Sequence, residues 1–533
     1  MSSVEVPAVR SIPELLAATT QRYGDSLAVR DGDLELTYSE LQSAARKFAA
    51  ALVEHGVEPG DRVSIWMPNG ARWIVAVLGI FTSGAVLVPI NTRFKGGEAG
   101  EILRRSKARL LLTVTDFLGT DYVGMLTGAG GELPALQQVV VAAGDVPPGA
   151  TTWDGFVGAA GDEARAEVDR RSVALGPDDP SDILFTSGTT GVPKGVVMTH
   201  GRTLCVATDW MRMTGLRHGD RYLMVNPYFH MFGLKAGILA SVAAGATMLP
   251  EPVFEVDRVL TRAGAEAVTV LPGPPTLYQS ILDHPDRDRY DLSTLRVAVT
   301  GSADIPVSLI ERVFAELPFP TIISGYGLTE AGTANSTAPD DPPEAIATTV
   351  GHARPGFEIR LVDGSGADVA PGESGEVLLR GPSVMSHYLD DPEATAAALS
   401  ADGWLKTGDI GAFDDDGRLR IVGRAKDMFI VGGFNAYPAE IENMLLKHSA
   451  VTAAAVIGIP DPRLGEVGMA FVVLEPGSEV SGEDIVAWSR DQMANYKVPR
   501  AVEIVDALPL NATGKVVKDE LRARVADRQD PNP

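Results

Sequence analysis

The spacing of hydrophobic positions changes along the chain between the period of a helix and that of a strand. Residues 38–55 carry apolar or small side chains at helical spacing, and Gly56 after them predicts the end of a helix. Residues 62–67, 267–271 and 297–300 are short runs rich in β-branched and other apolar residues. Helices that alternate with such strands predict an α/β fold with largely parallel sheets.

The longest apolar stretch, residues 74–90, is interrupted by Thr, Ser, Gly and Pro. A bilayer-spanning helix needs about 20 consecutive, predominantly apolar residues, so this stretch predicts a buried helix that runs into a strand. Residues 1–10 lack the apolar core that signal peptides carry. Together these features predict a cytoplasmic protein without a membrane span.

Three later segments differ in composition from this α/β pattern. Residues 128–180 are rich in Gly, Ala, Pro and Asp, which predicts a surface excursion with little regular structure. Residues 377–422 have the pattern of short strands joined by turns, which predicts a β-rich subdomain. A compact α/β segment follows Arg424. We therefore expect a large N-terminal domain at 1–423, a hinge at 424–427 and a small C-terminal α/β domain at 428–533.

The composition narrows the range of functions. Among the 533 residues, 46 basic against 70 acidic side chains give a net charge of −24. An acidic surface repels nucleic acid and anionic membranes, so neither is an expected partner, and an anionic nucleotide must be held by a local site. The single cysteine, Cys205, excludes an intrachain disulfide, and the eight histidines lack metal-ligand spacing such as HExxH.

The strongest local motif is a loop rich in Gly, Ser and Thr at residues 186–195, which follows the apolar, strand-like residues 183–185. Glycines allow backbone N–H groups to converge on one anion, and the hydroxyls and a lysine add donors suited to a triphosphate. The spacing differs from the Walker pattern GxxxxGK[ST]. A flexible surface loop is the alternative, but the Pro-Lys-Gly near its end favours phosphate binding. The predicted phosphate-binding residues are Thr186, Ser187, Gly188, Thr189, Thr190, Gly191 and Lys194.

Several separated motifs follow this loop along the chain. They are Tyr-Phe-His at 228–230, Tyr-Gly-Leu-Thr-Glu at 326–330, Thr-Gly-Asp at 407–409, Gly-Arg at 423–424 and Asn-Ala-Thr-Gly-Lys at 511–515. Over nearly its whole length the chain resembles the adenylate-forming superfamily of acyl-CoA synthetases, nonribosomal adenylation domains and beetle luciferases. The resemblance implies a large N-terminal domain and a small mobile C-terminal domain, with ATP, Mg²⁺ and coenzyme A as cofactors.

The resemblance also implies roles in the nucleotide site. Thr329 would contact the α-phosphate, and Glu330 would hold Mg²⁺, a metal that prefers hard oxygen ligands, with Thr186 as a second candidate ligand. Asp409 would bind the ribose hydroxyls, and Arg424 would reach the nucleotide. The alternatives are a solvated surface acid for Glu330 and a surface ion pair for Asp409 and Arg424. The other nucleotide-pocket residues implied are Gly301, Ser302, Ala303, Gly325, Tyr326, Gly327 and Ile421.

Two further residues are implied in the chemistry. Lys515 would place an ammonium where negative charge builds at the α-phosphorus, and charge preorganised for a transition state contributes roughly 3 kcal/mol. His230, flanked by aromatic residues, would lie near the substrate carboxylate and gate access between the acyl and nucleotide sites. A core histidine is the alternative for His230.

Two half-reactions need two arrangements of one active site, because Lys515 must leave before a thiol attacks the adenylate. The family achieves this by rotating its C-terminal domain, and Lys426 stands at the hinge position. Gly432, Gly433 and Phe434 match the loop that lines the pantetheine tunnel of coenzyme A. Some plant phenylpropanoid ligases carry lysines in this stretch, where this chain has isoleucine and glycine.

Within the superfamily, residues 227–237, 271–276 and 432–438 resemble actinobacterial ligases of the fatty-acid type, in particular one acting on the bicyclic propanoate left from steroid rings C and D. The implied reaction activates a carboxylic acid with ATP as an acyl-adenylate and transfers the acyl group to coenzyme A. A free-standing enzyme that loads a carrier protein and a non-catalytic regulatory protein of the same fold are the alternatives. The expected partners are the small-molecule acid, ATP and coenzyme A, with a homodimer as a further expectation. Lys235 either meets a polar group of the acid or extends to the surface.

Overall fold

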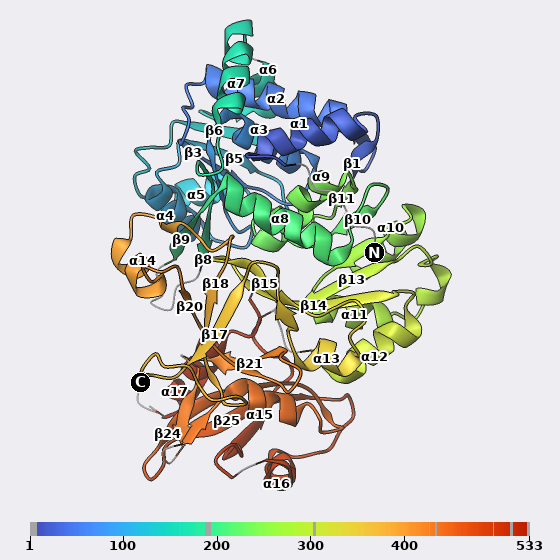
Figure 1. Cartoon of the computed structure of the whole chain (residues 1–533), viewed down its shortest axis with the longest axis vertical. Coiled ribbons are helices and arrows are strands. Elements are labelled where there is room, and N and C mark those ends of the chain that lie inside the picture. Colours follow the sequence, from blue (N-terminus) through green and yellow to red (C-terminus); the bar gives the residue numbers. More distant parts are fainter. Residues whose placement is uncertain are drawn as a thin grey trace.

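The computed structural model describes residues 8–158, 160–186, 193–301, 305–425, 427–431, 434–493, 495–511 and 515–529. In Figure 1 the segment after strand β21 (Leu419–Arg424) forms the lower, orange-red part of the molecule, and the earlier chain forms the parts above it. The predicted hinge at 424–427 falls between these two parts. The boundaries 1–423 and 428–533 stay a prediction, as does the pivot at Lys426, which lies outside the described residues.

Within the described residues, nine strands form one central sheet in the order β16-β15-β14-β13-β12-β10-β11-β1-β2. Neighbouring strands from β14 to β1 pair in parallel, so their carboxyl ends meet at one edge of the sheet. The strands are β1 (Leu27–Asp31), β2 (Leu34–Thr37), β10 (Arg221–Met224), β11 (Thr247–Pro250), β12 (Val270–Pro272), β13 (Val297–Gly301), β14 (Thr321–Leu328), β15 (Gly332–Ser336) and β16 (His352–Ala353).

A second sheet has eight strands in the described chain, in the order β19-β9-β8-β4-β3-β5-β6-β7. Its strands β8 and β9 form an antiparallel pair in which Thr186 lies opposite Lys194, at the two ends of the predicted phosphate loop. The strands are β3 (Arg62–Trp66), β4 (Val86–Pro89), β5 (Leu110–Val114), β6 (Gln138–Ala143), β7 (Thr151–Thr152), β8 (Pro180–Thr186), β9 (Lys194–Thr199) and β19 (His387–Tyr388).

One large hydrophobic core joins these two sheets through the helices packed between and against them. The core contains Phe48, Trp73 and Trp210 together with buried residues of the strands. The apolar stretch at 74–90 contributes to this core as a helix that runs into a strand, as predicted. The helices of this part are α1 (Ile12–Tyr23), α2 (Tyr38–Glu54), α3 (Ala71–Ser83), α4 (Gly96–Ser106), α5 (Tyr122–Ala129), α8 (His200–Thr214), the π-helix η1 (Phe232–Leu239), α9 (Ala240–Ala244), α10 (Val256–Ala265), α11 (Pro275–Leu282), η2 (Arg287–Arg289), α12 (Val307–Glu316) and α13 (Pro343–Thr348).

The expectation of little regular structure at 128–180 is wrong. Strands β6 and β7 extend the second sheet, and helices α6 (Trp153–Gly158) and α7 (Asp162–Ala174) follow them. Helix α7 buries only Ala164, Val168 and Arg171, and the two apolar residues pack against the alanines of α2. A contact made by small residues leaves a weak hydrophobic period, so composition alone pointed to a loop.

The β-rich part and the C-terminal part are separate sheets of the described chain. The first is antiparallel, in the order β17-β18-β20-β21, and the second contains β22 to β26. Their remaining elements are β17 (Glu358–Val362), β18 (Gly375–Arg380), α14 (Pro392–Ala398), β20 (Leu405–Phe413), β22 (Phe429–Val431), β23 (Phe434–Ala436), α15 (Pro438–Leu445), β24 (Val451–Asp461), β25 (Gly465–Leu474), α16 (Gly482–Gln492), β26 (Ala501–Ile504) and α17 (Lys518–Gln529).

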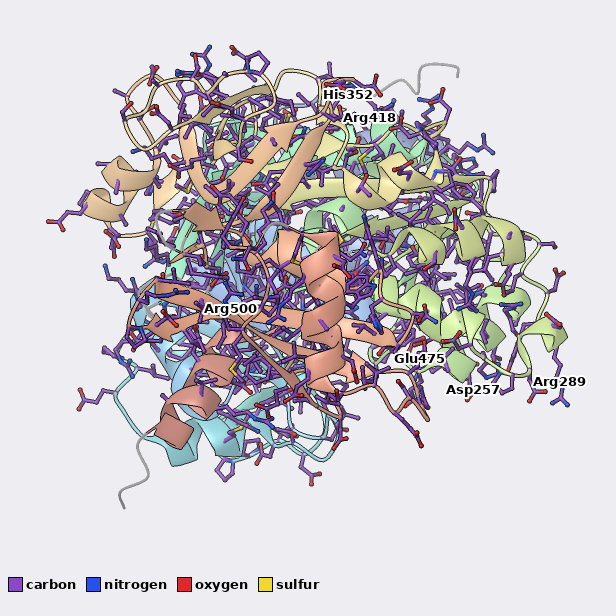
Figure 2. All side chains as sticks on the ribbon, turned by 90° about the horizontal axis from the view of Figure 1, so that it is seen from below. Asp257, Arg289, His352, Arg418, Glu475 and Arg500 are labelled. Carbon is purple, nitrogen blue, oxygen red and sulfur yellow. The ribbon has the colours of Figure 1, made fainter. Side chains whose placement is uncertain are left out.

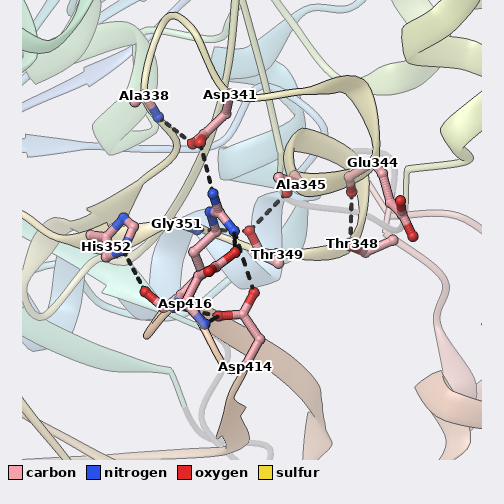
Figure 3. Close-up of polar contacts among 11 residues, drawn as sticks. Ala338, Asp341, Glu344, Ala345, Thr348, Thr349, Gly351, His352, Asp414 and Asp416 are labelled. Carbon is pink, nitrogen blue, oxygen red and sulfur yellow. Dashed lines mark hydrogen bonds and ion pairs between the residues drawn. The ribbon is translucent and has the colours of Figure 1, made fainter.

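The turn of the β20–β21 hairpin is fastened to the central part of the molecule by a polar cluster (Figure 3). Arg418 forms ion pairs with Asp341, at 3.3 Å, and with Asp416, at 2.5 Å. His352 Nε2 lies 3.2 Å from the carbonyl oxygen of Asp416. Because β20 and β21 carry Asp409 and Arg424, this cluster fixes the element that supplies two predicted nucleotide-binding residues.

The fold class predicted from the sequence, α/β with a β-rich subdomain and a small C-terminal α/β part, is confirmed. Charged side chains such as Asp257 and Arg289 lie at the periphery of the molecule (Figure 2). Across the part of the chain that the structure describes, no helix has both the length and the apolar character needed to span a bilayer.

Candidate active site

A cleft of about 1300 Å³ lies between the central sheet and the C-terminal part of the chain. Residues at the carboxyl ends of β13 and β14 line one side, together with Asp409, Ile421 and Arg424 of the β-rich sheet. Helix α15 and the loop that carries Lys515 line the other side. The cleft therefore collects predicted residues from three parts of the sequence.

Two glycines keep backbone rather than side chains at the wall of this cleft. Gly301 has a φ of +150°, and a Cβ there would lie 2.8 Å from the carbonyl oxygen of Gly325, its partner in the parallel pair β13–β14. A Cβ on Gly327 would lie 2.2 Å from the carbonyl oxygen of Gly332. Only glycine fits these positions, so the wall between them can be approached closely by a flat ligand.

The polar centre of the cleft is the buried carboxylate of Asp409. Tyr326 donates its hydroxyl to Asp409 Oδ2 at 2.6 Å, and Arg424 Nε lies 2.9 Å from Oδ1. Asp409 and Arg424 face each other across the β20–β21 pair, so the ladder itself sets their distance. Burial, and then the charge of Asp409, raise the pKa of Tyr326 well above its usual range. Tyr326 is therefore a neutral donor, and each oxygen of Asp409 keeps a free lone pair for a ligand.

A second polar group surrounds the ends of the predicted phosphate loop. Strand β19 pairs with β9, which places the ring of Tyr388 5.1 Å from Lys194 Nζ, a cation–π contact. Tyr388 also donates its hydroxyl to Glu330 Oε1 at 2.9 Å. Tyr388 thus joins the lysine of the loop to the carboxylate predicted to hold the metal, and Thr329 lies beside Glu330 in the turn after β14.

The charge of Lys515 acts on His230 across the boundary between the two parts. The loop of Lys515 is closed by a hydrogen bond from its own N–H to Asn511 Oδ1 at 2.9 Å. Surrounding protein and Arg424 lower the pKa of Lys515, while Asp409 opposes them. Removal from water, followed by the charge of Lys515, lowers the pKa of His230 to about 4. Both groups therefore lie in one electrostatic site.

The tautomer of His230 follows from its hydrogen bond. The N–H of Phe232 donates to His230 Nδ1 at 3.2 Å, so Nδ1 is unprotonated and the neutral ring carries its proton on Nε2. His230 also lines a second cavity, of about 510 Å³. Gly301 lines both this cavity and the cleft, so the two spaces meet there.

The second cavity is largely apolar and opens to solvent. Its walls come from loops and helix starts that follow strands of both sheets, and its rim carries the exposed side chains of Leu118, Phe254 and Leu510. Arg93 Nη1 donates to the carbonyl oxygen of Asn511 at 3.5 Å beside this rim. The apolar lining residues are Pro68, Phe117, Leu118, Val225, Pro227, Phe229, Phe232, Pro252, Val253, Phe254, Pro274, Leu277 and Leu510.

Comparison with known protein families accounts for this arrangement. The family described as "AMP-binding enzyme" matches residues 16–389, and the one described as "AMP-binding enzyme C-terminal domain" matches residues 440–515. The chain belongs to the AMP-binding enzyme family. The matches include both sides of the cleft, from Gly301 and Tyr326 on one side to Lys515 on the other.

Two relatives in this family are similar over almost their whole length. Both are named 3-[(3aS,4S,7aS)-7a-methyl-1,5-dioxo-octahydro-1H-inden-4-yl]propanoyl:CoA ligase. The relative from Rhodococcus jostii (strain RHA1) is 48% identical over 96% of this chain and 98% of its own length. The relative from Mycobacterium tuberculosis (strain ATCC 25618 / H37Rv) is also 48% identical, over 96% of this chain and 99% of its own length.

A solved structure shows the same architecture. An anthranilate CoA ligase in complex with anthranoyl-AMP superposes with a TM-score of 0.87 at 29% identity, over 99% of this chain and 100% of the other. The resemblance to the adenylate-forming superfamily is therefore confirmed, and so is its resemblance to ligases of the bicyclic propanoate.

The structure brings part of the predicted AMP-binding site together. Gly301, Gly325, Tyr326, Gly327, Asp409, Ile421, Arg424 and Lys515 all line the cleft. Thr186 and Lys194 lie opposite each other, and His230 lines the adjoining cavity. Phe434 lies in β23, and its side chain is not described. The predicted residues that lie outside the described chain are Ser187, Gly188, Thr189, Thr190, Gly191, Ser302, Ala303, Lys426, Gly432 and Gly433.

Two features of the site were missed from the sequence. Tyr388 was not singled out, because the pairing of β19 with β9 that brings it to Lys194 and Glu330 joins segments almost two hundred positions apart. Lys235 was expected at the surface or against the acid, and both alternatives are wrong. Its ammonium is fully buried against Asp182.

Proposed function

We propose that this protein is an ATP-dependent acyl-CoA synthetase. It joins a carboxylate to ATP, releasing diphosphate and forming an acyl-adenylate, and then transfers the acyl group to the thiol of coenzyme A, releasing AMP. The observation that supports this most strongly is the junction at Gly301 between a polar cleft containing Asp409 and Lys515 and an apolar cavity lined by His230. Such a junction suits a reaction between a nucleotide phosphate and an apolar acid.

The nucleotide lies in the cleft in this proposal. Asp409 accepts hydrogen bonds from the two ribose hydroxyls, with the lone pairs that Tyr326 and Arg424 leave free. The bare backbone of Gly301 and Gly325 lies against the adenine, and Ile421 packs on it. Thr329 contacts the α-phosphate.

The triphosphate lies over the loop between Thr186 and Lys194. Glu330 supplies carboxylate oxygens and Thr186 a hydroxyl, which are the hard donors that suit Mg²⁺, and Glu330 Oε2 is not engaged by Tyr388. Bound Mg²⁺ neutralises phosphate charge. The few protein ligands fit a metal that binds mainly through the phosphates of its nucleotide.

Lys515 acts in the first half-reaction. Its ammonium stabilises the negative charge that develops on the α-phosphoryl group as a carboxylate oxygen attacks phosphorus and diphosphate leaves. Neutral His230 orients the acid at the mouth of the apolar cavity without adding a second positive charge. In the second half-reaction, the C-terminal part rotates about Lys426. Gly432, Gly433 and Phe434 then line the tunnel through which coenzyme A reaches the adenylate.

The acid is bicyclic and largely apolar in this proposal. The relatives that are 48% identical are named for a propanoate on a methyl-octahydroindene dione. A cavity of about 510 Å³ with mostly apolar walls has the size and character of sites that bury ligands of this kind. A cytoplasmic location and a homodimer complete the proposal.

A CoA-ligation screen tests this function. The purified chain is given ATP, Mg²⁺ and coenzyme A with the bicyclic dione propanoic acid, medium-chain fatty acids, ferulic acid, acetate and an amino acid. We expect diphosphate release and acyl-CoA formation to be fastest with the bicyclic acid. Preference for acetate or an amino acid would contradict the substrate assignment. Adenylation followed by transfer only to a carrier-protein pantetheine would contradict coenzyme A as acceptor.

A further inference from the structure

A pair of opposite charges lies in the interior behind the active site. Lys235 Nζ is 2.8 Å from Asp182 Oδ2, and both side chains are 0% exposed. Asp182 Oδ1 accepts hydrogen bonds from Ser181 Oγ and Thr203 Oγ1, each at 2.7 Å. Among the described residues, the ammonium of Lys235 has no partner besides Asp182. Within the described chain, Asp182 Oδ2 likewise has no partner besides Lys235, so both charged atoms depend on this one contact.

Stability alone does not explain such a pair. Two buried charges lose their hydration, and apolar residues of similar volume often stabilise a protein equally well or better. Burial lowers the pKa of the neighbouring His200 to about 4, so this ring is neutral near pH 7 and Lys235 remains the cation that faces Asp182. The role of the pair is therefore inferred from the strand and helix that it joins.

Three contacts join strand β8, helix α8 and the π-helix η1 in a closed triangle. Asp182 on β8 binds Thr203 on α8, and Trp210 of α8 packs edge-on against Phe232 of η1 with ring centroids 5.0 Å apart. The ion pair between Asp182 and Lys235 forms the third side, from β8 to η1. The relative position of all three elements is therefore set by polar and aromatic contacts with defined geometry.

Two of these elements lead directly into the active site. Strand β8 ends at Thr186, where the phosphate loop begins, four positions after Asp182. Helix η1 begins at Phe232, which lines the apolar cavity, and His230 lies five positions before Lys235. The ion pair thus spans the interior between the phosphate side and the acid side of the site.

The backbone of η1 supports this interpretation. A π-helix has hydrogen bonds between residues five positions apart, is rare, and is frequently found at functional sites. Here the N–H of Ala240 donates to the carbonyl oxygen of Lys235, five positions back. A Cβ on Gly233 would lie 2.2 Å from the carbonyl oxygen of Pro227, so η1 packs directly on the segment that leads to His230. A shift of η1 would therefore move His230 and Phe232.

We propose that Lys235 and Asp182 are a positioning pair for adenylation, which holds the acid-binding start of η1 at a fixed distance from β8 and the phosphate loop. This inference rests on the proposed acyl-CoA synthetase function. Neither side chain touches a substrate. The pair acts on the alignment of the acid with the α-phosphate, on which the first half-reaction depends and attack of a thiol on finished adenylate does not.

The test compares the double variant Lys235→Met/Asp182→Asn with the wild type. Asparagine keeps an acceptor for Ser181 and Thr203, and methionine fills the volume of the lysine stem, so no lone charge stays buried. The matched control is Asp220→Asn/Arg296→Met, which removes an ion pair of 2.5 Å at the amino ends of β10 and β13, away from the cleft. The single variants Lys235→Met and Asp182→Asn each leave a buried lone charge and are expected to lower the melting temperature more than the double variant does.

Each variant is measured for melting temperature, for kcat and KM of adenylation with ATP and the bicyclic dione propanoic acid, and for thiolysis of the synthetic acyl-adenylate. We expect the double variant to lose about 10- to 100-fold in adenylation kcat, as for a misplacement on the order of 1 Å. The KM values for ATP and acid should change little, and thiolysis should stay near the wild-type rate. The control should keep wild-type kinetics at a lowered melting temperature.

Two results would overturn the positioning role. The first is wild-type adenylation kcat in a folded double variant. The second is an equal loss in adenylation and thiolysis, which would indicate general loosening of the site. Failure of the wild-type protein to form any acyl-adenylate would instead overturn the proposed function, and the role of the pair with it.

Discussion

The polar centre of the cleft is built on paired strands, whereas the apolar cavity takes its walls from loops and helix starts. Tyr326, Asp409 and Arg424 lie on strands β14, β20 and β21, and register fixes the distance between the last two. The cavity walls come from segments after β3, β5, β10, β11 and β12. Side chains on strands are held more precisely than side chains on loops, while loops can vary in shape without disturbing the sheet. We infer that the cleft determines the adenylation chemistry and that the cavity determines which acid is accepted.

The largest expected effect comes from the cleft. Lys515→Ala removes the ammonium that, in the proposed mechanism, acts on developing phosphoryl charge, and adenylation should fall by about 10²- to 10³-fold. Thiolysis of synthetic acyl-adenylate should change little, because the proposed rotation of the C-terminal part removes Lys515 from the site before that step. Diphosphate release and acyl-CoA formation from the adenylate are measured separately. If a folded variant lost activity equally in both steps, Lys515 would have no specific role in adenylation.

A second change tests whether the carboxylate or only the hairpin matters. Asp409→Asn removes the charge that faces Arg424 and would weaken the proposed hydrogen bonds from ribose to residue 409, so the KM for ATP should rise about 10- to 100-fold. The control is Asp341→Asn, which loosens the Arg418 cluster at the turn of the same hairpin. If both variants raised the KM for ATP equally, hairpin position rather than nucleotide contact would explain the effect.

A third change tests the link between the phosphate loop and Glu330, the proposed metal ligand. Tyr388→Phe keeps the ring under Lys194 and removes the hydroxyl that orients Glu330. We expect the Mg²⁺ concentration for half-maximal binding of ATP, followed by calorimetry, to rise about five- to tenfold. The partly exposed Tyr290, changed to Phe, serves as the control. Unchanged Mg²⁺ dependence would mean that Glu330 needs no such support.

The main polar residues of the cleft could be predicted from the sequence, whereas the contacts that surround them could not. Asp409, Arg424 and Lys515 occur in short motifs that resemble those of a known superfamily, and all three line one cleft. Tyr388 and the Asp182–Lys235 pair depend on contacts between distant segments, which no local period reveals. Lys235 was misjudged because a lysine in an apolar run ordinarily extends to the surface. Helix α7 was missed because its buried face is made of very few apolar residues.

The cavity should respond differently from the cleft. Val225→Ala removes two methyl groups from the wall, so the KM for the bicyclic acid should rise about three- to fivefold while the adenylation kcat stays near wild type. Longer, flexible acids should lose less, because they can refill the space. Competition between the bicyclic acid and a medium-chain fatty acid measures this shift in preference. A fall in kcat with an unchanged KM would show that the wall acts on chemistry and not on selection.

The smallest effect is expected at His230, which lines the cavity close to its junction with the cleft at Gly301. Its pKa is lowered to about 4, so the neutral ring prevails above that pH, and protonation becomes important only as the pH falls towards 4. An ordinary histidine near 6.5 would place an inflection in the middle of the working range. The pH profile of kcat/KM for adenylation should therefore show no inflection between about pH 5.5 and 8 that His230→Asn removes. The wild type and His230→Asn are compared over this range with saturating ATP. An inflection near pH 6.5 in the wild type that the variant lacks would mean that His230 is solvated and titrates in the working range. The cavity would then carry a charge beside the cleft, which contradicts the contrast between a charged cleft and an uncharged cavity.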